Sequence, residues 1–568
     1  MTSEADILAQ LHALWDRNWP ADTARAPAYP FGEIPLSDYL REWTRRQPDV
    51  PAFIFYGTAI SYAELDRLSD AFAALIAAHG ARPGDRIAVF LPNCPQFVIA
   101  FFGILKAGCV HVPVNPLFKE HELLYELDDT AAGIIVVQDQ LMPLVDKVRA
   151  GTKLRDVLVT SLVEMLPERP AFAVHPTVLT QRIDWPDAID LMPALRATDA
   201  PPPRHVATLD ALAALNYTSG TTGMPKGCEH TQGDMLYTAA TANACALGIE
   251  PGEVCLCFAP IFWIAGEDMG VIFPVFAGAT CVLMARWDAT GFMQAVERHR
   301  VSQVWMLVDS VAEILDHPDL ARHDLRSLRK VSASSLLKKL SVAYRERWRA
   351  LTGGVLVEAA YGMTETQTFD TFTVGLQDGD RDLAAQPVFV GLPMPQTEIL
   401  IRDFETGAAL PIGQEGEITI RSPSVTRGYW GKPEATAASF VAGGWLRTGD
   451  IGAFDADGFL RYLGRRKEML KVRGMSVFPA EIEAILGKHP DVLGSGVIGS
   501  DDPERGQVPL AAITLKPGAT VSEAELAAWC RENMATYKVP RIRIVGELPM
   551  TATGKVKKDE LAKLLACA

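Results

Sequence analysis

The sequence predicts an α/β protein with a large N-terminal domain of helix-flanked sheets, a small β-barrel, and a small α+β C-terminal domain. Three observations support this prediction. Apolar strand-like runs alternate with helical runs up to about residue 350, which is typical of a largely parallel sheet. Residues 388–429 change to short β-rich runs between Gly/Pro turns, and an α+β pattern restarts after Gly464. We therefore expect one domain over residues 1–464 and a second over 465–568.

The individual elements follow from apolar spacing, caps and breakers. Ser61 is a typical N-cap and Gly80 a typical stop, so they bound a helix between them. The other expected helices are 36–46, 97–106, 235–247, 291–300, 338–350, 479–486 and 523–532. The expected strands are 52–55, 86–91, 110–114, 134–137, 254–258, 280–284, 304–308, 398–401 and 417–421, with two more near 497 and 512. Residues 201–203, all proline, indicate a linker.

Residues 217–227 form the most informative stretch, a loop rich in glycine and hydroxyl groups. Its polar and flexible residues are Thr218, Ser219, Gly220, Thr221, Thr222, Gly223, Lys226 and Gly227. Successive backbone N–H groups in such a loop form an anion nest, and a lysine adds a charge suited to phosphate. The loop is not a Walker A motif, because Pro225 and Gly227 occupy positions where that motif needs Gly and Ser or Thr. We expect it to join an apolar strand at 212–215 to the helix at 235–247, as a phosphate-binding loop.

Composition restricts the classes of function. The net charge of −15 argues against a nucleic-acid-binding protein, and the hydrophobic content of 48% is typical of a soluble globular one. From Arg465 onward the chain has 16 Lys/Arg and 13 Asp/Glu, or +3, so the preceding part has −18. Nine scattered cysteines without a CxxC pair argue against a zinc site and favour a reducing cytoplasm. The sequence shows no signal pattern or transmembrane segment, and a homodimer is compatible with it.

Several short motifs, including the loop above, are distributed over most of the chain. They are residues 106–108 (Lys-Ala-Gly) through 113–116 (Pro-Val-Asn-Pro), the loop above, 361–366 (Tyr-Gly-Met-Thr-Glu-Thr), 444–450 (Gly-Trp-Leu-Arg-Thr-Gly-Asp), Gly464-Arg465, 471–474 (Lys-Val-Arg-Gly), and Pro549 through Gly554-Lys555. With these motifs the sequence resembles the adenylate-forming superfamily of acyl-CoA synthetases, luciferases and peptide-synthetase adenylation domains. The resemblance implies that the C-terminal domain is mobile and turns about a hinge near Lys467.

The resemblance also implies roles for individual residues. Tyr361 would cover the adenine, Thr364 would touch the α-phosphate, and Glu365 would hold Mg²⁺, which usually takes only one or two protein carboxylates. Asp450 and Arg465 would contact the ribose. Lys555 would stabilise the charge that develops during adenyl transfer, with Thr218 and Glu365 as its catalytic partners. Arg473 and Gly474 would border the path of coenzyme A.

Several positions depart from the family pattern around the acyl pocket, to which we assign Trp263, Ile264 and Ser334. Trp263 replaces a common histidine, and residues 333–335 read Ala-Ser-Ser instead of Gly/Ala-Ala-Pro. Ala360 replaces a glycine and Gln232 a second histidine. Glu267 and Asp268 either face an amine on the substrate or are exposed or structurally paired. The apolar neighbours of Trp263, including Phe262, favour a fatty or aromatic acid.

The predicted function is therefore that of an ATP-dependent carboxylic acid–CoA ligase that forms an acyl-adenylate and then a thioester. ATP and coenzyme A would be its co-substrates and Mg²⁺ its metal. Two alternatives remain open at the sequence level. One is an adenylate-forming enzyme with another acceptor, such as an amine or a carrier protein. The other is a non-catalytic nucleotide-binding protein, against which the intact Glu365, Asp450 and Lys555 argue.

Overall fold

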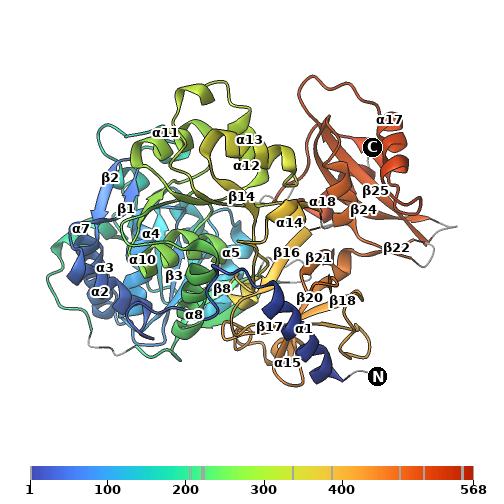
Figure 1. The fold of residues 1–568 in the computed structure, drawn as a ribbon. Helices are drawn as coiled ribbons and strands as arrows, with labels where there is room; N and C mark the ends of the chain where they lie inside the picture. Colours follow the sequence, from blue (N-terminus) through green and yellow to red (C-terminus); the bar gives the residue numbers. More distant parts are fainter. Residues whose placement is uncertain are drawn as a thin grey trace.

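The computed structural model describes residues 3–203, 205, 207–218, 224–335, 338–384, 388–472, 475–502, 506–551 and 555–566. It shows a mixed α/β fold with a large N-terminal part, a half-barrel sheet and a small α+β unit, as the sequence predicts (Figure 1). Within these ranges, none of the helices combines the length and apolar character that crossing a bilayer requires. The boundary at residues 464–465 remains a prediction.

The first large sheet has seven strands in the order β7-β6-β5-β3-β4-β8-β9. Its strands are β3 (Arg86–Phe90), β4 (Val110–Pro113), β5 (Ile134–Gln138), β6 (Asp156–Thr160), β7 (Ile189–Asp190), β8 (Leu212–Tyr217) and β9 (Gly227–Thr231). Its helices are α3 (Tyr62–Ala78), α4 (Pro95–Lys106), α5 (Glu120–Thr130), α6 (Met142–Arg149) and α7 (Leu191–Ala197). Ser61 caps α3 by accepting a hydrogen bond from the backbone N–H of Glu64, as expected. Only β8 and β9 are antiparallel to each other in this sheet.

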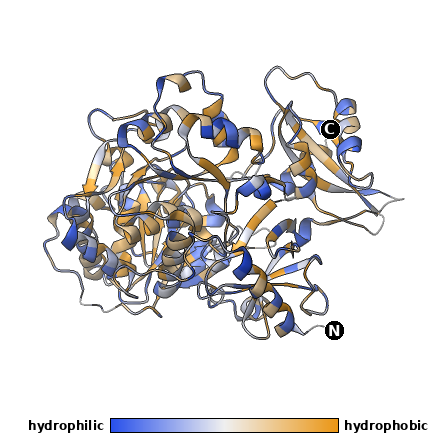
Figure 2. Ribbon diagram, viewed as in Figure 1, coloured by the Kyte–Doolittle hydropathy of each residue, from blue (hydrophilic) through white to orange (hydrophobic). Residues whose placement is uncertain are grey.

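The second large sheet has the order β14-β13-β12-β10-β11-β1-β2. Its strands are β1 (Pro51–Phe55), β2 (Thr58–Ser61), β10 (Val254–Cys257), β11 (Thr280–Leu283), β12 (Gln303–Leu307), β13 (Lys330–Ser334) and β14 (Val355–Glu358). Its helices are α2 (Leu36–Arg46), α8 (Gln232–Ala242), α9 (Ile264–Glu267), α10 (Phe273–Ala277), α11 (Ala289–His299), α12 (Val308–Leu315) and α13 (Val342–Thr352). One core cluster joins both sheets, and α4 is buried on all sides within it. Apolar residues concentrate on the inner strands, and polar residues lie on the outer helices (Figure 2).

The third sheet is antiparallel and curls only partway into a barrel, because its edge strands β15 and β17 do not pair with each other. Its strands are β15 (Thr371–Phe372), β16 (Val388–Pro393), β17 (Glu398–Arg402), β18 (Gly416–Arg421), β19 (Phe440–Val441), β20 (Trp445–Phe454) and β21 (Leu460–Arg465), with short helices α14 (Arg381–Ala384) and α15 (Pro433–Ala438) nearby. We call it the half-barrel.

Helix α1 (Glu4–Asn18) packs across the half-barrel (Figure 1). The indole Nε1 of Trp15 donates to the carbonyl oxygen of Gly458 at 2.9 Å. The side chain of Asn18 donates to the carbonyl oxygen of Asp457 at 2.8 Å. Both acceptors lie in the turn between β20 and β21, so α1 stabilises the hairpin that leads to the C-terminal unit.

The C-terminal unit contains β22 (Leu470–Val472), β23 (Met475–Val477), β24 (Val492–Asp502), β25 (Gly506–Leu515) and β26 (Arg541–Ile544), with helices α16 (Pro479–Leu486), α17 (Glu523–Asn533) and α18 (Lys558–Ala566). Its sheet order is β23-β22-β25-β24, with β26 added beside β25. Its core is separate from those of the N-terminal sheets. The predicted helices at 479–486 and 523–532 are confirmed.

One prediction about topology is wrong. The loop at 217–227 does not join a strand directly to a helix, because β9 comes between the loop and α8 and pairs antiparallel with β8. The sequence of β9 (Gly-Cys-Glu-His-Thr) ends in three consecutive polar residues and has little intrinsic strand signal. It is held as a strand by neighbours on both sides: β8, and the backbone of residues 427–430. The expected helix at 338–350 also starts later, at Val342, because Ser341 caps it.

Candidate active site

A cavity of about 2230 Å³ lies where the N-terminal sheets, the half-barrel and the C-terminal unit meet. Ten of the predicted site residues line it: Thr218, Trp263, Ile264, Ser334, Tyr361, Thr364, Asp450, Arg465, Lys467 and Lys555. Glu365 and Lys226 are not among the residues that line the cavity, and both contact Tyr429. The predicted residues Ser219, Gly220, Thr221, Thr222, Gly223, Arg473 and Gly474 lie outside the described part of the chain.

Thr218 and Lys226 close the neck of the predicted phosphate loop. The backbone N–H of Thr218 donates to the carbonyl oxygen of Lys226 at 3.0 Å, and the backbone N–H of Lys226 donates to Thr218 Oγ1 at 3.3 Å. The hydroxyl of Tyr125, on α5, donates to the carbonyl oxygen of Pro225 at 2.9 Å. The loop therefore leaves and re-enters the sheet at one fixed point on the cavity wall.

Tyr361, Asp450 and Arg465 form a compact polar group on the cavity wall. The Tyr361 hydroxyl donates to Asp450 Oδ2 at 2.6 Å, and Arg465 Nε lies 2.8 Å from Asp450 Oδ1. Burial raises the pKa of Asp450 above its ordinary value, while the Arg465 guanidinium opposes that rise. Burial and the Asp450 carboxylate raise the pKa of Tyr361, so its hydroxyl remains a donor. A carboxylate held in this way can accept hydrogen bonds from a pair of sugar hydroxyls.

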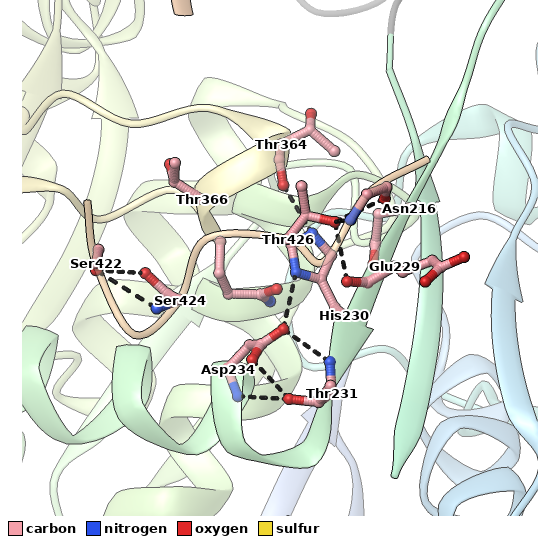
Figure 3. Close-up of polar contacts among 12 residues, drawn as sticks. Asn216, Glu229, His230, Thr231, Asp234, Thr364, Thr366, Ser422, Ser424 and Thr426 are labelled. Atoms are coloured by element: carbon pink, nitrogen blue, oxygen red, sulfur yellow. Dashed lines mark hydrogen bonds and ion pairs between the residues drawn. The ribbon is translucent and has the colours of Figure 1, made fainter. Parts of the chain in front are cut away.

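Thr364 and Glu365 are held from two directions. His230, on β9, is fully buried, and its Nε2 lies 2.7 Å from the carbonyl oxygen of Thr364 (Figure 3). Because a carbonyl oxygen only accepts, Nε2 carries the proton in this contact. The other ring nitrogen faces Asp234 Oδ2 at 3.6 Å. The backbone N–H of Thr426 donates to the carbonyl oxygen of Glu365 at 2.8 Å. Both backbone carbonyls of this motif are therefore fixed by elements outside it.

The loop that contains these residues, 361–370, is folded tightly on itself. Gln367 and Thr368 both have the left-handed backbone conformation, with φ of 55° and 67°. This conformation is rare for a β-branched residue such as Thr368. Their side chains donate to the carboxylate of Asp268, at 3.1 and 2.6 Å. A Cβ on Gly362 would lie only 1.7 Å from the carbonyl oxygen of Thr368. Asp268 thus stabilises a strained loop that only glycine at position 362 allows.

Glu267 and Asp268 are structurally paired, which was one of the two readings of this pair. Both are fully buried. His111 Nε2 lies 3.0 Å from Glu267 Oε2, and Asn216 Nδ2 lies 3.4 Å from Glu267 Oε1. Neither residue lines the cavity. Glu267 connects the helical segment after Trp263 to the strands β4 and β8, and Asp268 connects it to the loop 361–370.

One face of β12, β13 and β14 forms a wall of the cavity, with apolar side chains on β12 and β14 and serines on β13. Trp305, Ser332 and Val357 lie in register across the three strands, and Leu307 lies beside Ser334. All five line the cavity. The Trp305 indole Nε1 donates to Ser334 Oγ at 3.0 Å, which fixes the orientation of its ring. We call this face the strand wall. Trp263, Phe262 and Ile264 line the same cavity from the loop before α9.

Lys555 reaches the cavity from the C-terminal unit. Its backbone N–H donates to Thr551 Oγ1 at 3.0 Å, and its carbonyl oxygen accepts from the backbone N–H of Thr551 at 2.7 Å. The surrounding cavity walls and the Arg465 guanidinium lower the pKa of the Lys555 ammonium, while Asp450 acts in the opposite direction. Water still reaches the side chain. The structure thus brings Lys555 to the same cavity as Asp450 and Arg465.

Sequence reasoning did not identify four residues that support the site: His230, Asp268, Trp305 and Tyr429. Trp305 lies on the predicted strand at 304–308, which could have placed it. His230 lies on β9, whose own residues give little strand signal. Asp268 was noted only as one of a pair of carboxylates. Tyr429 had no local signal, since its partners lie on distant segments.

Comparisons with known proteins agree with this architecture. The model of the family "AMP-binding enzyme" matches residues 40–430, and that of the "AMP-binding enzyme C-terminal domain" matches residues 481–555. A long-chain-fatty-acid–CoA ligase of Bacillus subtilis is 32% identical over 560 residues, covering 96% of this chain and 97% of the relative. A feruloyl-CoA synthase of Amycolatopsis sp. is 31% identical over 525 residues, covering 91% and 96%. The crystal structure of the anthranilate CoA ligase AuaEII with anthranoyl-AMP has a TM-score of 0.81 at 28% identity, covering 94% of this chain and 98% of that one.

Proposed function

Because the chain belongs to the family of AMP-binding enzymes, we propose that it is an ATP-dependent carboxylic acid–CoA ligase acting on a fatty or other bulky apolar acid. In the first step a carboxylate oxygen of the acid attacks the α-phosphorus of ATP, and pyrophosphate leaves. In the second step the thiol of coenzyme A attacks the carbonyl carbon of the acyl-adenylate, and AMP leaves. The products are an acyl-CoA thioester, AMP and pyrophosphate.

The strand wall supports the choice of acid. Leu307, Trp305 and Val357 present apolar surface to the cavity. Strand β12 advances about 3.3 Å per residue, so the four intervals from Gln303 to Leu307 make the wall about 13 Å long. At its far end Lys330 is paired with Glu253 at 2.8 Å, so the apolar part ends at an ion pair. An extended or aromatic acyl group fits such a wall, and a two-carbon acid would leave most of it uncovered.

The polar residues of the cavity suit the nucleotide half of the reaction. Tyr361, Asp450 and Arg465 would hold the adenosine, and the neck formed by Thr218 and Lys226 would place the phosphate loop against the triphosphate. Lys555 would bridge the acid carboxylate and the α-phosphate as charge builds there. The turn of the C-terminal unit about Lys467 would then remove Lys555 and bring Arg473 and Gly474 to the coenzyme A path.

Glu365 fits a Mg²⁺ ion, because it is a buried carboxylate near the phosphate loop and Mg²⁺ usually takes only one or two protein carboxylates. Among the described residues there is no cluster of three or more His, Cys, Asp or Glu that would hold a metal without help from phosphates. Bound there, the ion would offset the charge of the phosphates.

A thioester screen over acids of graded chain length, with benzoate- and cinnamate-type acids added, tests the proposal. We expect kcat/KM to rise with the apolar area of the acid and to be lowest with acetate. A clear preference for acetate would refute the assignment of the strand wall. Thioester formation measured beside hydroxamate formation from hydroxylamine would show whether the acyl-adenylate forms without transfer to coenzyme A.

A further inference from the structure

Residues 426–430, which we call the strap, connect the half-barrel to the strand that leaves the phosphate loop. The backbone N–H of Trp430 donates to the carbonyl oxygen of Gly227 at 2.8 Å, and that of Glu229 donates to the carbonyl oxygen of Gly428 at 3.0 Å. Cys228 and Tyr429 lie opposite each other in this bridge. The backbone of Tyr429 is therefore fixed directly beside the end of the phosphate loop.

The Tyr429 side chain contacts two groups of the nucleotide site at once. Its hydroxyl donates to Glu365 Oε1 at 2.8 Å, and the Lys226 ammonium lies 4.1 Å from the centre of its ring. Tyr429 and Glu365 are each only 8% exposed. Burial and the nearby Glu365 carboxylate raise the pKa of Tyr429, so the phenol remains protonated and donates.

Each contact has a different physical effect. The hydroxyl restricts the rotation of the Glu365 carboxylate by occupying Oε1, and it leaves the second oxygen available as a ligand. The ring face attracts the Lys226 ammonium through its quadrupole. An ammonium–phosphate contact is charge-assisted and stronger, so a triphosphate would draw Lys226 off the ring.

We propose that Tyr429 is a positioning residue for the nucleotide half of the reaction. Its hydroxyl orients Glu365 toward the metal, and its ring keeps Lys226 beside the phosphate loop until ATP arrives. The inference rests on the proposed function, which assigns Glu365 to Mg²⁺ and Lys226 to phosphate. Hydrogen bonds that orient a metal-ligating carboxylate are a general requirement of metal sites.

Tyr429→Phe tests the hydroxyl, because it keeps the ring against Lys226 and removes only the donor to Glu365. The first measurement is ATP binding by calorimetry, without acid, at stepped Mg²⁺ concentrations. We expect the Mg²⁺ concentration for half-maximal ATP binding to rise about 10–100-fold, the usual effect of losing a supporting hydrogen bond at a metal site. The KM for the acid should not change. Tyr429→Leu should raise the Mg²⁺ requirement as Tyr429→Phe does, and it should not weaken ATP binding at saturating Mg²⁺, because the ring contact that it removes from Lys226 is one that ATP binding breaks.

Tyr237→Phe is the matched control. The Tyr237 hydroxyl is also buried between an N-terminal helix and the half-barrel, where it donates to the carbonyl oxygen of Pro395 at 2.5 Å. Its removal deletes the same chemical group away from the cavity. We expect Tyr237→Phe to lower the melting temperature by a similar amount and to leave the Mg²⁺ requirement unchanged.

Glu365→Gln separates failure of the inference from failure of the proposed function. If Glu365→Gln raises the Mg²⁺ requirement and Tyr429→Phe does not, the inference about Tyr429 is wrong and the metal assignment stands. If Glu365→Gln leaves the requirement unchanged, the metal assignment itself fails. If Tyr429→Phe and Tyr237→Phe shift the melting temperature and the Mg²⁺ requirement equally, Tyr429 is a structural residue only.

Discussion

Replacing Gly362 with alanine tests whether the tight packing of the 361–370 loop is needed for adenylation. The new Cβ would lie 1.7 Å from the carbonyl oxygen of Thr368, whereas real Cβ contacts stay above 3.0 Å. The two sides of the loop would have to separate by at least 1.3 Å, the difference between these distances. Asp268 resists this movement through its hydrogen bond to Thr368. A misplacement of about 1 Å can cost about 10²-fold in rate, or about 2.7 kcal/mol of activation free energy.

The assay is acid-dependent ATP–pyrophosphate exchange, with kcat/KM for ATP as the readout and the melting temperature as the check on folding. Gly546→Ala is the matched control, because a Cβ at position 546 meets nothing within 4 Å. We expect a loss of about 10²-fold for Gly362→Ala and none for Gly546→Ala. If Gly362→Ala keeps kcat/KM within about twofold of the wild type at an unchanged melting temperature, the loop tolerates the separation and the tight packing of residues 361–370 is not needed for adenylation.

Three further predictions concern the two half-reactions, the acid and pH. Lys555→Ala should lose about 10²–10³-fold in pyrophosphate exchange yet form thioester from synthetic acyl-adenylate and coenzyme A at nearly the wild-type rate. Equal losses in both assays would contradict the proposal that the C-terminal unit turns and removes Lys555 before the second step. Trp263→Ala and Trp305→Ala should each change the ranking of acids, by about 1–3 kcal/mol per methylene, without changing the KM for ATP; an unchanged ranking would place these indoles outside the acyl pocket. Burial raises the pKa of Glu358 from 4.5 to about 7, so the folded state holds this proton more tightly than the unfolded state, and wild-type stability falls as pH rises between these values. Glu358→Gln lacks this titration, so its free energy of unfolding relative to that of the wild type should rise by about 3 kcal/mol between pH 4.5 and pH 7 and then level off. Melting temperatures of the two proteins that run parallel at every pH would contradict the raised pKa of Glu358.

The elements that the sequence predicts well have their own local signals. The helix at 36–46 and the helix at 479–486 have the predicted bounds, because amphipathic spacing and proline at the start define them locally. Buried strands such as β3 and β5 were also predicted, since they are continuous apolar runs. Strands β6, β13 and β14 were not predicted. Strand β9 was missed, because its pairing partners and not its own residues make it a strand.

The same distinction holds for the candidate site. Ordered motifs along the chain identified several of the residues that line the cavity, including Asp450 and Lys555. The residues that hold them were not predicted. His230 contacts Thr364 across 134 positions, and Asp268 contacts Thr368 across 100 positions. Such contacts depend on how the sheets pack, and no short pattern in the sequence encodes them.

The docking of helix α1 constrains the order in which the chain can fold during synthesis. Trp15 bonds to a carbonyl oxygen 443 positions later, so α1 cannot reach its binding surface until nearly all of the half-barrel has left the ribosome. Domains generally fold as units during synthesis, N-terminal ones first. Helix α1 is made before the half-barrel but is placed after it, since its apolar side (Ile7, Leu11 and Trp15) packs on the half-barrel strands. The same hairpin continues into Arg465, so helix α1 supports the strand from which the C-terminal unit extends.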